Sequence, residues 1–162
     1  MEQVRIKLIR EKDLNSKEVT TLDDAVSFIG DLIKDADREM LIAVNLDSRK
    51  KPTNYTIVSM GSLSSSIVHA REVFKAAILS NADSIMLFHN HPTGIAAPSM
   101  SDAVTTMKLI EAGELLGIPL IDHIIVGTNG CYSFKDKGLI DDEQALQSLQ
   151  TSKEVEHGLF TR

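Results

Sequence analysis

The hydrophobic pattern divides the chain into short apolar strands and amphipathic helices. Val4, Ile6 and Leu8 alternate with charged residues and predict a first strand. The next apolar positions recur at helical spacing behind a Thr21-x-x-Asp24 capping-box pattern, which predicts a helix of about four turns. Its apolar positions are Leu22, Ala25, Val26, Ile29, Ile33 and Ala36.

Strands buried on both faces follow this helix. The run Met40–Leu46 is apolar at nearly every position, which is typical of such a strand, and Tyr55–Met60 is its expected antiparallel neighbour. A further helix carries Val73, Phe74, Ala77 and Ile78 on one face. The short apolar strand Ser84–Phe88 then leads directly into two histidines.

The last third of the chain continues the alternation of helices and strands. We expect a third helix between Pro98 and Gly117, strands at Leu120–Val126 and Cys131–Phe134, and a terminal helix at Asp141–Leu149. This order predicts an α/β fold with a mixed β-sheet and helices packed on its faces. No G-x-G-x-x-G and no phosphate loop occurs, which argues against nucleotide binding.

Composition indicates an ordinary soluble domain. The chain has 162 residues, 43% of them hydrophobic and 25% charged, which is enough for one domain with a full core. No apolar run approaches the roughly 18 residues of a membrane span, so we expect a cytoplasmic protein with no membrane partner. The single cysteine, Cys131, cannot form an internal disulfide, and its place beside Tyr132 and Phe134 predicts a core position.

The charge balance argues against binding through nucleic-acid phosphates. Lysine and arginine total 17 against 23 acidic residues, giving a formal charge of −6. The basic trio Arg49-Lys50-Lys51 precedes Pro52, and we interpret it as a solvated turn between strands. A nucleic-acid partner therefore has no support from charge.

Candidate chemistry gathers after the strand that ends near Phe88. His89 and His91 are two residues apart, so strand geometry directs both imidazoles to one face. Asp102 is the nearest candidate for a third ligand, and two histidines with one carboxylate are a typical catalytic zinc set. Ser99-x-x-Asp102 is also a capping-box pattern, so both residues can cap the third helix as well as serve a site.

These residues follow the spacing of the JAMM metalloprotease motif, also called MPN or JAB, in which H-x-H, seven residues and S-x-x-D occur after a distant glutamate. Within that superfamily the chain resembles the bacterial RadC family. The resemblance is carried by Ser66-Ile-Val-His-Ala-Arg-Glu-Val73, Phe88-His-Asn-His-Pro-Thr-Gly94, Ala112-Gly-Glu-Leu-Leu-Gly117 and Asp122-His-Ile-Ile-Val-Gly127. It implies a cytidine-deaminase-like sandwich over residues 21–146, with a strand and lead-in at 1–20 and a tail at 147–162.

The resemblance also assigns roles. It implies that His89, His91 and Asp102 bind Zn²⁺, that Glu39 is the general base and that Ser99 stabilises the oxyanion. Glu72 is a rival for Glu39, although a helix-surface pair with Lys75 explains it as well.

Two further histidines, His69 and His123, match the family pattern and are interpreted as hydrogen-bonded structural groups or partners of the ligands.

The implied function is a zinc-dependent hydrolase that cleaves peptide or isopeptide-like amide bonds. The alternative is a RadC-family protein of DNA repair or mobile elements, with a nuclease or non-catalytic role. The helix-hairpin-helix region of full-length RadC proteins has no counterpart in the sequence, so we expect a stand-alone domain. Asn90, Thr93 and Ala70 depart from residues that are common in relatives at these positions.

Overall fold

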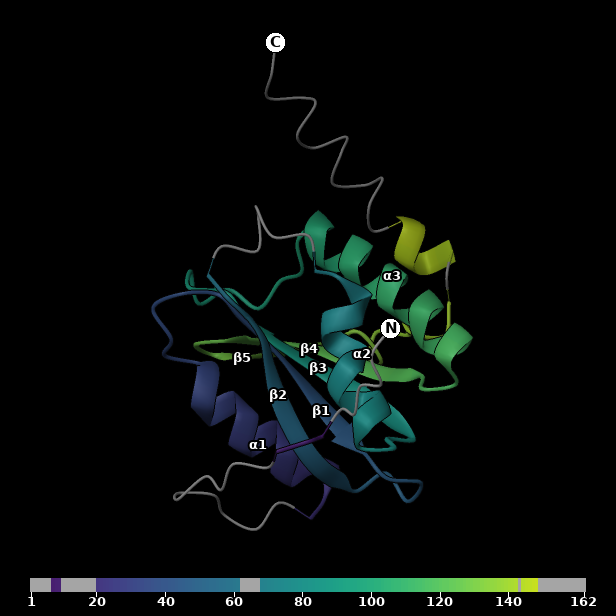
Figure 1. The fold of residues 1–162 in the computed structure, drawn as a ribbon. Helices are drawn as coiled ribbons and strands as arrows, with labels where there is room; N and C mark the ends of the chain where they lie inside the picture. The colour runs from purple at the N-terminus through teal and green to yellow at the C-terminus, as the bar shows by residue number, and fades with distance from the viewer. Residues whose placement is uncertain (1–6, 10–19, 62–67, 143, 149–162) are drawn as a thin grey trace.

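A five-stranded mixed sheet forms the centre of the computed structural model, which describes residues 7–9, 20–61, 68–142 and 144–148. The strands are β1 (Met40–Leu46), β2 (Pro52–Met60), β3 (Ser84–Asn90), β4 (Leu120–Gly127) and β5 (Gly130–Ser133), in the spatial order β2-β1-β3-β4-β5. β3 and β4 are parallel and the other neighbours are antiparallel. The predicted mixed sheet is confirmed (Figure 1).

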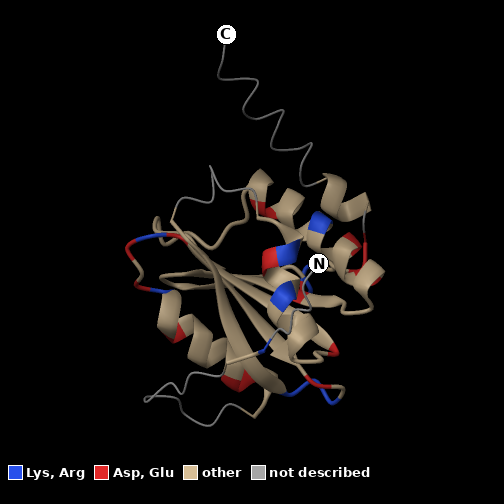
Figure 2. Cartoon of the chain, in the orientation of Figure 1, with Lys and Arg blue, Asp and Glu red and all other residues tan. Residues whose placement is uncertain are grey.

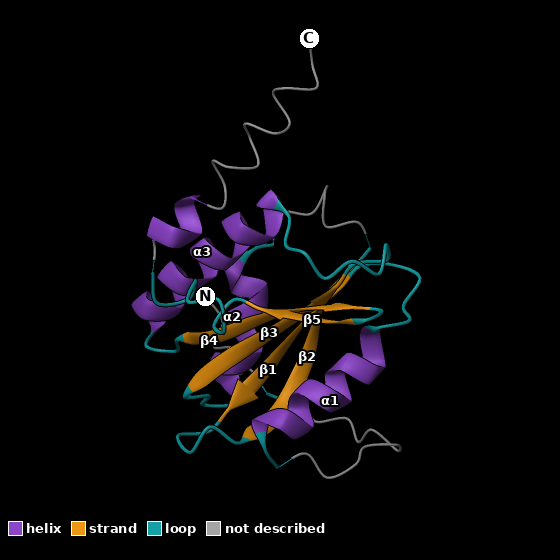
Figure 3. Cartoon of the chain, turned by 180° about the vertical axis from the view of Figure 1, so that it is seen from behind, coloured by secondary structure: helices purple, strands orange, loops and turns teal. Residues whose placement is uncertain are grey.

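Helices cover both faces of this sheet. α1 (Leu22–Ile33) packs on one face, and α2 (Ala70–Leu79) and α3 (Met100–Leu116) pack on the other (Figures 1 and 3). Alternate residues of the central strands enter the two cores. In β3, Met86 and Phe88 face α1, whereas Ile85 and Leu87 face α2 and α3. Both faces of β1 and β3 are buried, which explains their uninterrupted apolar runs.

Local signals in the sequence fix the ends of two helices. The Thr21–Asp24 capping box begins α1, which ends at Ile33, before the predicted position of Ala36. Gly117 ends α3 as predicted, because its left-handed conformation, with φ at 68°, suits glycine. A helical segment at residues 144–148 lies within the expected terminal helix. Of the predicted first strand, Val4 and Ile6 lie outside the described residues.

The prediction that Cys131 belongs to the core is wrong. Its side chain is exposed, because β5 is the last strand of the sheet and Phe134, just beyond the strand, fills the core instead. By contrast, the basic trio at 49–51 is an exposed turn as predicted, and Asp47 accepts the backbone N–H groups of Arg49 and Lys51.

Ribbon segments of charged residues are not grouped by sign in the cartoon of Figure 2. Blue and red segments are interspersed there over loops and helices, including the turn after β1 and the approach to it. Among the described helices, none combines the length and the apolar character that a membrane crossing requires.

Candidate metal centre

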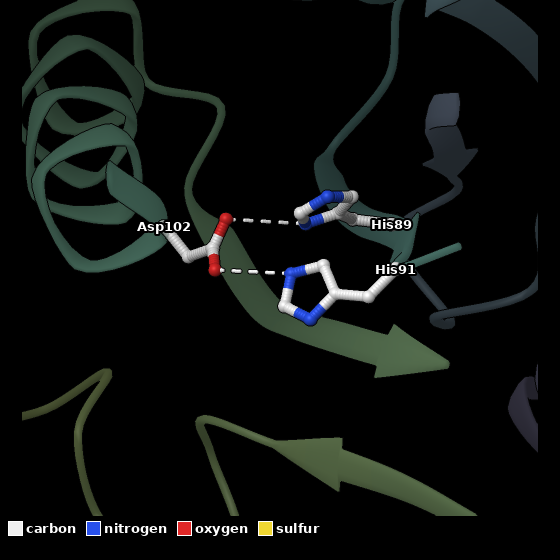
Figure 4. Close-up of side chains that lie close together, drawn as sticks. All are labelled: His89, His91 and Asp102. Atoms are coloured by element: carbon white, nitrogen blue, oxygen red, sulfur yellow. Dashed lines mark ion pairs between the residues drawn. The ribbon is translucent and has the colours of Figure 1, made fainter. Parts of the chain in front are cut away.

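The C-terminal end of β3 and the first turn of α3 bring three side chains together. His89 continues the face of Ile85 and Leu87, and His91 follows directly after the strand. Nδ1 of His89 lies 3.2 Å from Oδ1 of Asp102, and Nε2 of His91 lies 3.3 Å from Oδ2 of the same carboxylate (Figure 4). The predicted cluster therefore exists: α3 returns Asp102 to the end of the histidine strand.

The donor set fits a metal ion. His89, His91 and Asp102 each offer one ligand atom, and these atoms lie within 4.8 Å of one another. His89 is 2% exposed; its Nδ1 has the ion-pair contact with Asp102, and its Nε2 has no hydrogen-bond partner among the described residues. Buried polar atoms without partners are rare and call for an explanation. An ion shared by the three side chains would supply one, so the site could hold a metal.

Asp102 and the neighbouring imidazoles shift one another's pKa values. Burial opposes ionisation of Asp102, yet contacts with His89, His91 and Ser99 hold its pKa far below the usual range. The Asp102 carboxylate in turn raises the pKa of His91, against the opposing effect of burial, and the Ile95 carbonyl and Glu39 add to the rise. Asp102 is thus an anion that can pair with a protonated imidazole or with a metal cation.

Ser99 is the N-cap of α3 and a partner of Asp102. Its hydroxyl accepts the Asp102 backbone N–H at 3.2 Å and donates to Asp102 Oδ2 at 2.7 Å. The Ser99 backbone N–H donates to the same carboxylate oxygen at 2.6 Å. The capping box and the candidate metal site therefore share Asp102, and the cap orients its carboxylate.

The loop between His91 and Ser99 packs tightly on the end of β4. The Thr128 N–H donates to the Gly94 carbonyl at 2.9 Å. A Cβ atom on Gly94 would meet the Thr128 side chain, and one on Gly127 would lie 2.5 Å from the Gly94 carbonyl oxygen. Nδ1 of His91 lies 2.8 Å from the Ile95 carbonyl, which leaves Nε2 to face Asp102. Close packing of this loop thus orients the His91 ring.

Glu39 lies just before β1, across from the histidines. The antiparallel ladder between β1 and β3 ends at the pair of Leu41 and His89, so Glu39, two residues before Leu41, lies at the same end of the sheet as the histidines. Glu39 is partly exposed and is near enough to contribute to the raised pKa of His91. Glu72, the rival, lies on α2 and pairs with Lys75 at 2.7 Å, as predicted for a helix-surface pair.

His123 and His69 differ in environment. His123 is buried on β4, stacks on Phe134 with ring centroids 5.0 Å apart and places Nδ1 2.7 Å from the Thr106 hydroxyl. Burial lowers the pKa of His123 to about 3, so its ring is neutral at physiological pH. His69 is an exposed N-cap residue of α2 without a side-chain capping bond. The structural interpretation of His123 is confirmed.

The sequence interpretation missed two polar residues beside the site. Thr106 donates to the Asp102 carbonyl at 2.6 Å and contacts His123, so it ties the first turn of α3 to β4. Asn90 bonds with its side-chain amide to the backbone on either side of Glu39. An amide in an otherwise apolar, buried strand was the available signal, because buried amides require partners.

The mixed sheet with a histidine–carboxylate cluster at the end of β3 is consistent with a JAB/MPN-type fold. A comparison with family models matches residues 19–139 to the RadC-like JAB domain. The chain belongs to this family, and the resemblance noted in the sequence is confirmed.

Curated relatives agree with this assignment. A UPF0758 protein of Desulforamulus reducens is 45% identical over 118 residues, which cover 73% of this chain and 52% of the relative. UPF0758 proteins of Methanosarcina mazei and Staphylococcus aureus are 38% and 39% identical, with 76% and 82% of this chain and 54% and 61% of the relatives covered. The chain thus spans little more than half the length of these relatives.

Proposed function

We propose that the chain is a zinc-dependent hydrolase of peptide or isopeptide-like amide bonds. The observation that supports this most is the convergence of His89, His91 and Asp102, whose ligand atoms lie within 4.8 Å of one another, with Nε2 of His89 buried and without a hydrogen bond among the described residues. Two imidazoles and one carboxylate form a typical catalytic zinc set that leaves a coordination position open. Bound there, zinc would polarise water and lower its pKa to about 7.

Glu39 is the proposed general base. Its position at the end of the β1–β3 ladder, near enough to His91 to raise the pKa of that ring, suits a carboxylate that accepts a proton from the attacking water and passes it to the amide nitrogen. The new C–O bond forms first and gives a tetrahedral intermediate, from which the C–N bond then breaks, so the products are a carboxylate and an amine. Glu72 is not suited to this role, since Lys75 and Arg71 engage its carboxylate on the surface of α2.

Ser99 is the proposed donor to the oxyanion of the tetrahedral intermediate. The Ser99 hydroxyl proton is directed at Asp102 Oδ2 in the structure. The same hydroxyl can turn toward substrate once Asp102 interacts with a cation, because a hydroxyl rotates about its C–O bond. Ser99 then contributes a hydrogen bond where negative charge develops.

A matched pair of variants tests this proposal. Untagged, zinc-loaded protein is incubated with a peptide mixture and with isopeptide-linked peptides, and new amine termini are detected by mass spectrometry. We expect Glu39→Gln to keep its zinc and lose at least about 100-fold in rate, as for loss of a general base. Glu72→Gln is the control and keeps full activity. Normal turnover by Glu39→Gln would remove Glu39 from the mechanism.

The nucleic-acid alternative is decided with the same preparation. Labelled single- and double-stranded DNA is incubated with zinc-loaded protein at low and physiological salt. We expect neither cleavage nor a salt-dependent shift, since the net charge is −6. Cleavage that disappears in His89→Ala would favour a nuclease over the proposed amide hydrolase.

A further inference from the structure

Asn90 occupies a buried position between the two candidate ligands His89 and His91. It is 1% exposed, and alternation along β3 directs its side chain to the face opposite that of His89. Its Oδ1 accepts the Met40 N–H at 2.8 Å, and its Nδ2 donates to the Arg38 carbonyl at 3.1 Å. One side chain thus forms hydrogen bonds with two backbone groups of another segment.

These two backbone groups flank Glu39. The ladder between β1 and β3 has its last pair at Leu41 and His89, so Asn90 supplies hydrogen bonds where the ladder ends. On the other side, the Glu39 carbonyl accepts the Gly61 N–H at 2.9 Å. Hydrogen bonds therefore fix the main chain before, at and after Glu39, and two of them come from Asn90.

We propose that Asn90 is a positioning residue, which holds the backbone around Glu39 and so fixes the Glu39 carboxylate relative to His89 and His91. This inference rests on the proposed function, in which Glu39 carries the proton. One strand then contributes to both parts of the chemistry, since β3 provides the ligand His89 and the amide that places the base, and the second ligand, His91, follows it directly.

The chemistry of the amide explains why this position suits asparagine. The two backbone groups are one donor and one acceptor, and an amide offers one acceptor oxygen and one donor nitrogen on the same planar group. An ionised carboxylate offers acceptors alone, and a serine hydroxyl has a single oxygen on a shorter side chain. Neither can make both contacts in this geometry.

The first arm of the test measures the hydrogen bond between the Asn90 side chain and the Met40 N–H. Amide hydrogen exchange is followed by NMR in wild type, Asn90→Ala and Asn90→Ser. We expect the Met40 amide to exchange at least about tenfold faster in both variants, because its acceptor is lost or displaced. The serine variant keeps the test available if the alanine variant folds poorly. Unchanged Met40 exchange in a folded variant would overturn the proposal.

Asn45→Ala is the matched control for this arm. Asn45 is a buried amide at the far end of β1, where its Nδ2 bonds to Asn54 at 2.6 Å. Its loss also removes a buried hydrogen bond from the same sheet but leaves the Glu39 segment untouched. We expect normal Met40 exchange in this variant, and faster exchange there would show that the effect is general loosening, against the proposal.

The second arm measures the position of the Glu39 carboxylate without a substrate. Zinc is titrated into ¹³C-labelled protein, and the Glu39 carboxyl signal is assigned by its absence in Glu39→Gln. We expect the zinc-induced shift of this signal to be clearly smaller in Asn90→Ala, with a zinc Kd within about threefold of wild type. Loss of a residue that orients a ligand would instead weaken zinc binding roughly 10–100-fold. An unchanged shift, or such a loss of affinity, would contradict the positioning role.

Turnover completes the test and separates the two proposals. With any peptide cleaved by wild type, Asn90→Ala should lower kcat about 10–100-fold at unchanged KM and zinc content, since a displaced base acts only on the chemical step. A raised KM at constant kcat would overturn the inference. The NMR arms need no substrate. Failure of the hydrolase proposal, tested with Glu39→Gln, is therefore distinguishable from failure of the positioning role of Asn90.

Discussion

Nδ1 of His89 lies 3.2 Å from Oδ1 of Asp102, with both side chains buried. A carboxylate withdrawn from water is costly unless a positive charge compensates it. Contacts with His89 and His91 lower the pKa of Asp102, and the Asp102 carboxylate in turn raises the pKa of His91. A divalent cation bound by these side chains would compensate the negative charge of Asp102 in place of a protonated imidazole.

Zinc should therefore stabilise the folded chain. At a free concentration 100 times Kd, we expect the free energy of unfolding to rise by about 2.7 kcal/mol. Thermal unfolding with zinc and with chelator measures this difference. Asp102→Asn should abolish it, whereas Asp122→Asn, at a buried carboxyl bonded to Ser133 and the Lys135 N–H, should keep it. Equal zinc responses in both variants would place the ion elsewhere.

Ser99→Ala should affect both the fold and the site. Loss of a helix N-cap destabilises by about 1 kcal/mol, and Thr21→Ala, which removes the equivalent cap of α1, should cost a similar amount. Ser99→Ala alone should also weaken zinc binding by about tenfold or more, because Asp102 Oδ2 loses a hydrogen-bond donor. Urea unfolding and zinc titration of both variants measure the effects. Identical zinc affinities would show that the Ser99 hydroxyl does not orient Asp102 as a ligand.

His123 should make the metal-free protein sensitive to acid. Burial lowers its pKa from 6.5 to about 3, so between these values the unfolded chain binds a proton that the folded chain does not. Stability therefore falls as the pH is lowered through this window, by up to about 1.4 kcal/mol per pH unit. His123→Asn can retain a bond to Thr106 without an ionisable ring, and its unfolding free energy should fall less steeply. Parallel pH profiles for the two proteins, measured with chelator, would refute this.

Gly127 should tolerate no side chain. A Cβ atom there would lie 2.5 Å from the Gly94 carbonyl oxygen and 2.9 Å from the Ala96 nitrogen, so the loop that orients His91 must move. We expect Gly127→Ala to destabilise by about 1–3 kcal/mol and to weaken zinc binding. Gly30→Ala is the control, because its Cβ would meet nothing within 4 Å and alanine favours the helix by about 0.5–1 kcal/mol. If Gly127→Ala changes neither the free energy of unfolding nor the zinc affinity, the loop can move without destabilising the protein, which would contradict this prediction.

The candidate ligands could be predicted because their geometry is local. His89 lies on β3 and His91 directly after it, so the spacing of two residues predicts that both rings lie on one side of the chain. Because α3 begins only a short loop after β3 and leads back to the parallel strand β4, Asp102 in its first turn is expected near the end of β3. The capping pattern of Ser99 and Asp102 was likewise readable, since it depends on residues three apart.

Contacts that depend on strand register could not be predicted. The bonds from Asn90 to the backbone on both sides of Glu39 require the alignment of β1 with β3, which apolar periodicity alone does not set. The bond between Thr106 and His123 similarly depends on how α3 lies over β4. Cys131 was misplaced for a related reason: the sequence pattern did not identify β5 as an edge strand.

Metal content of the purified, untagged chain tests the central claim most directly. Elemental analysis after exposure to zinc and removal of the excess should give one zinc per wild-type chain, and almost none in His89→Ala. His69→Ala removes an exposed histidine at the start of α2 and should keep a full complement. Wild type that retains no zinc, or His89→Ala that binds as much as His69→Ala, would contradict a metal centre at the end of β3.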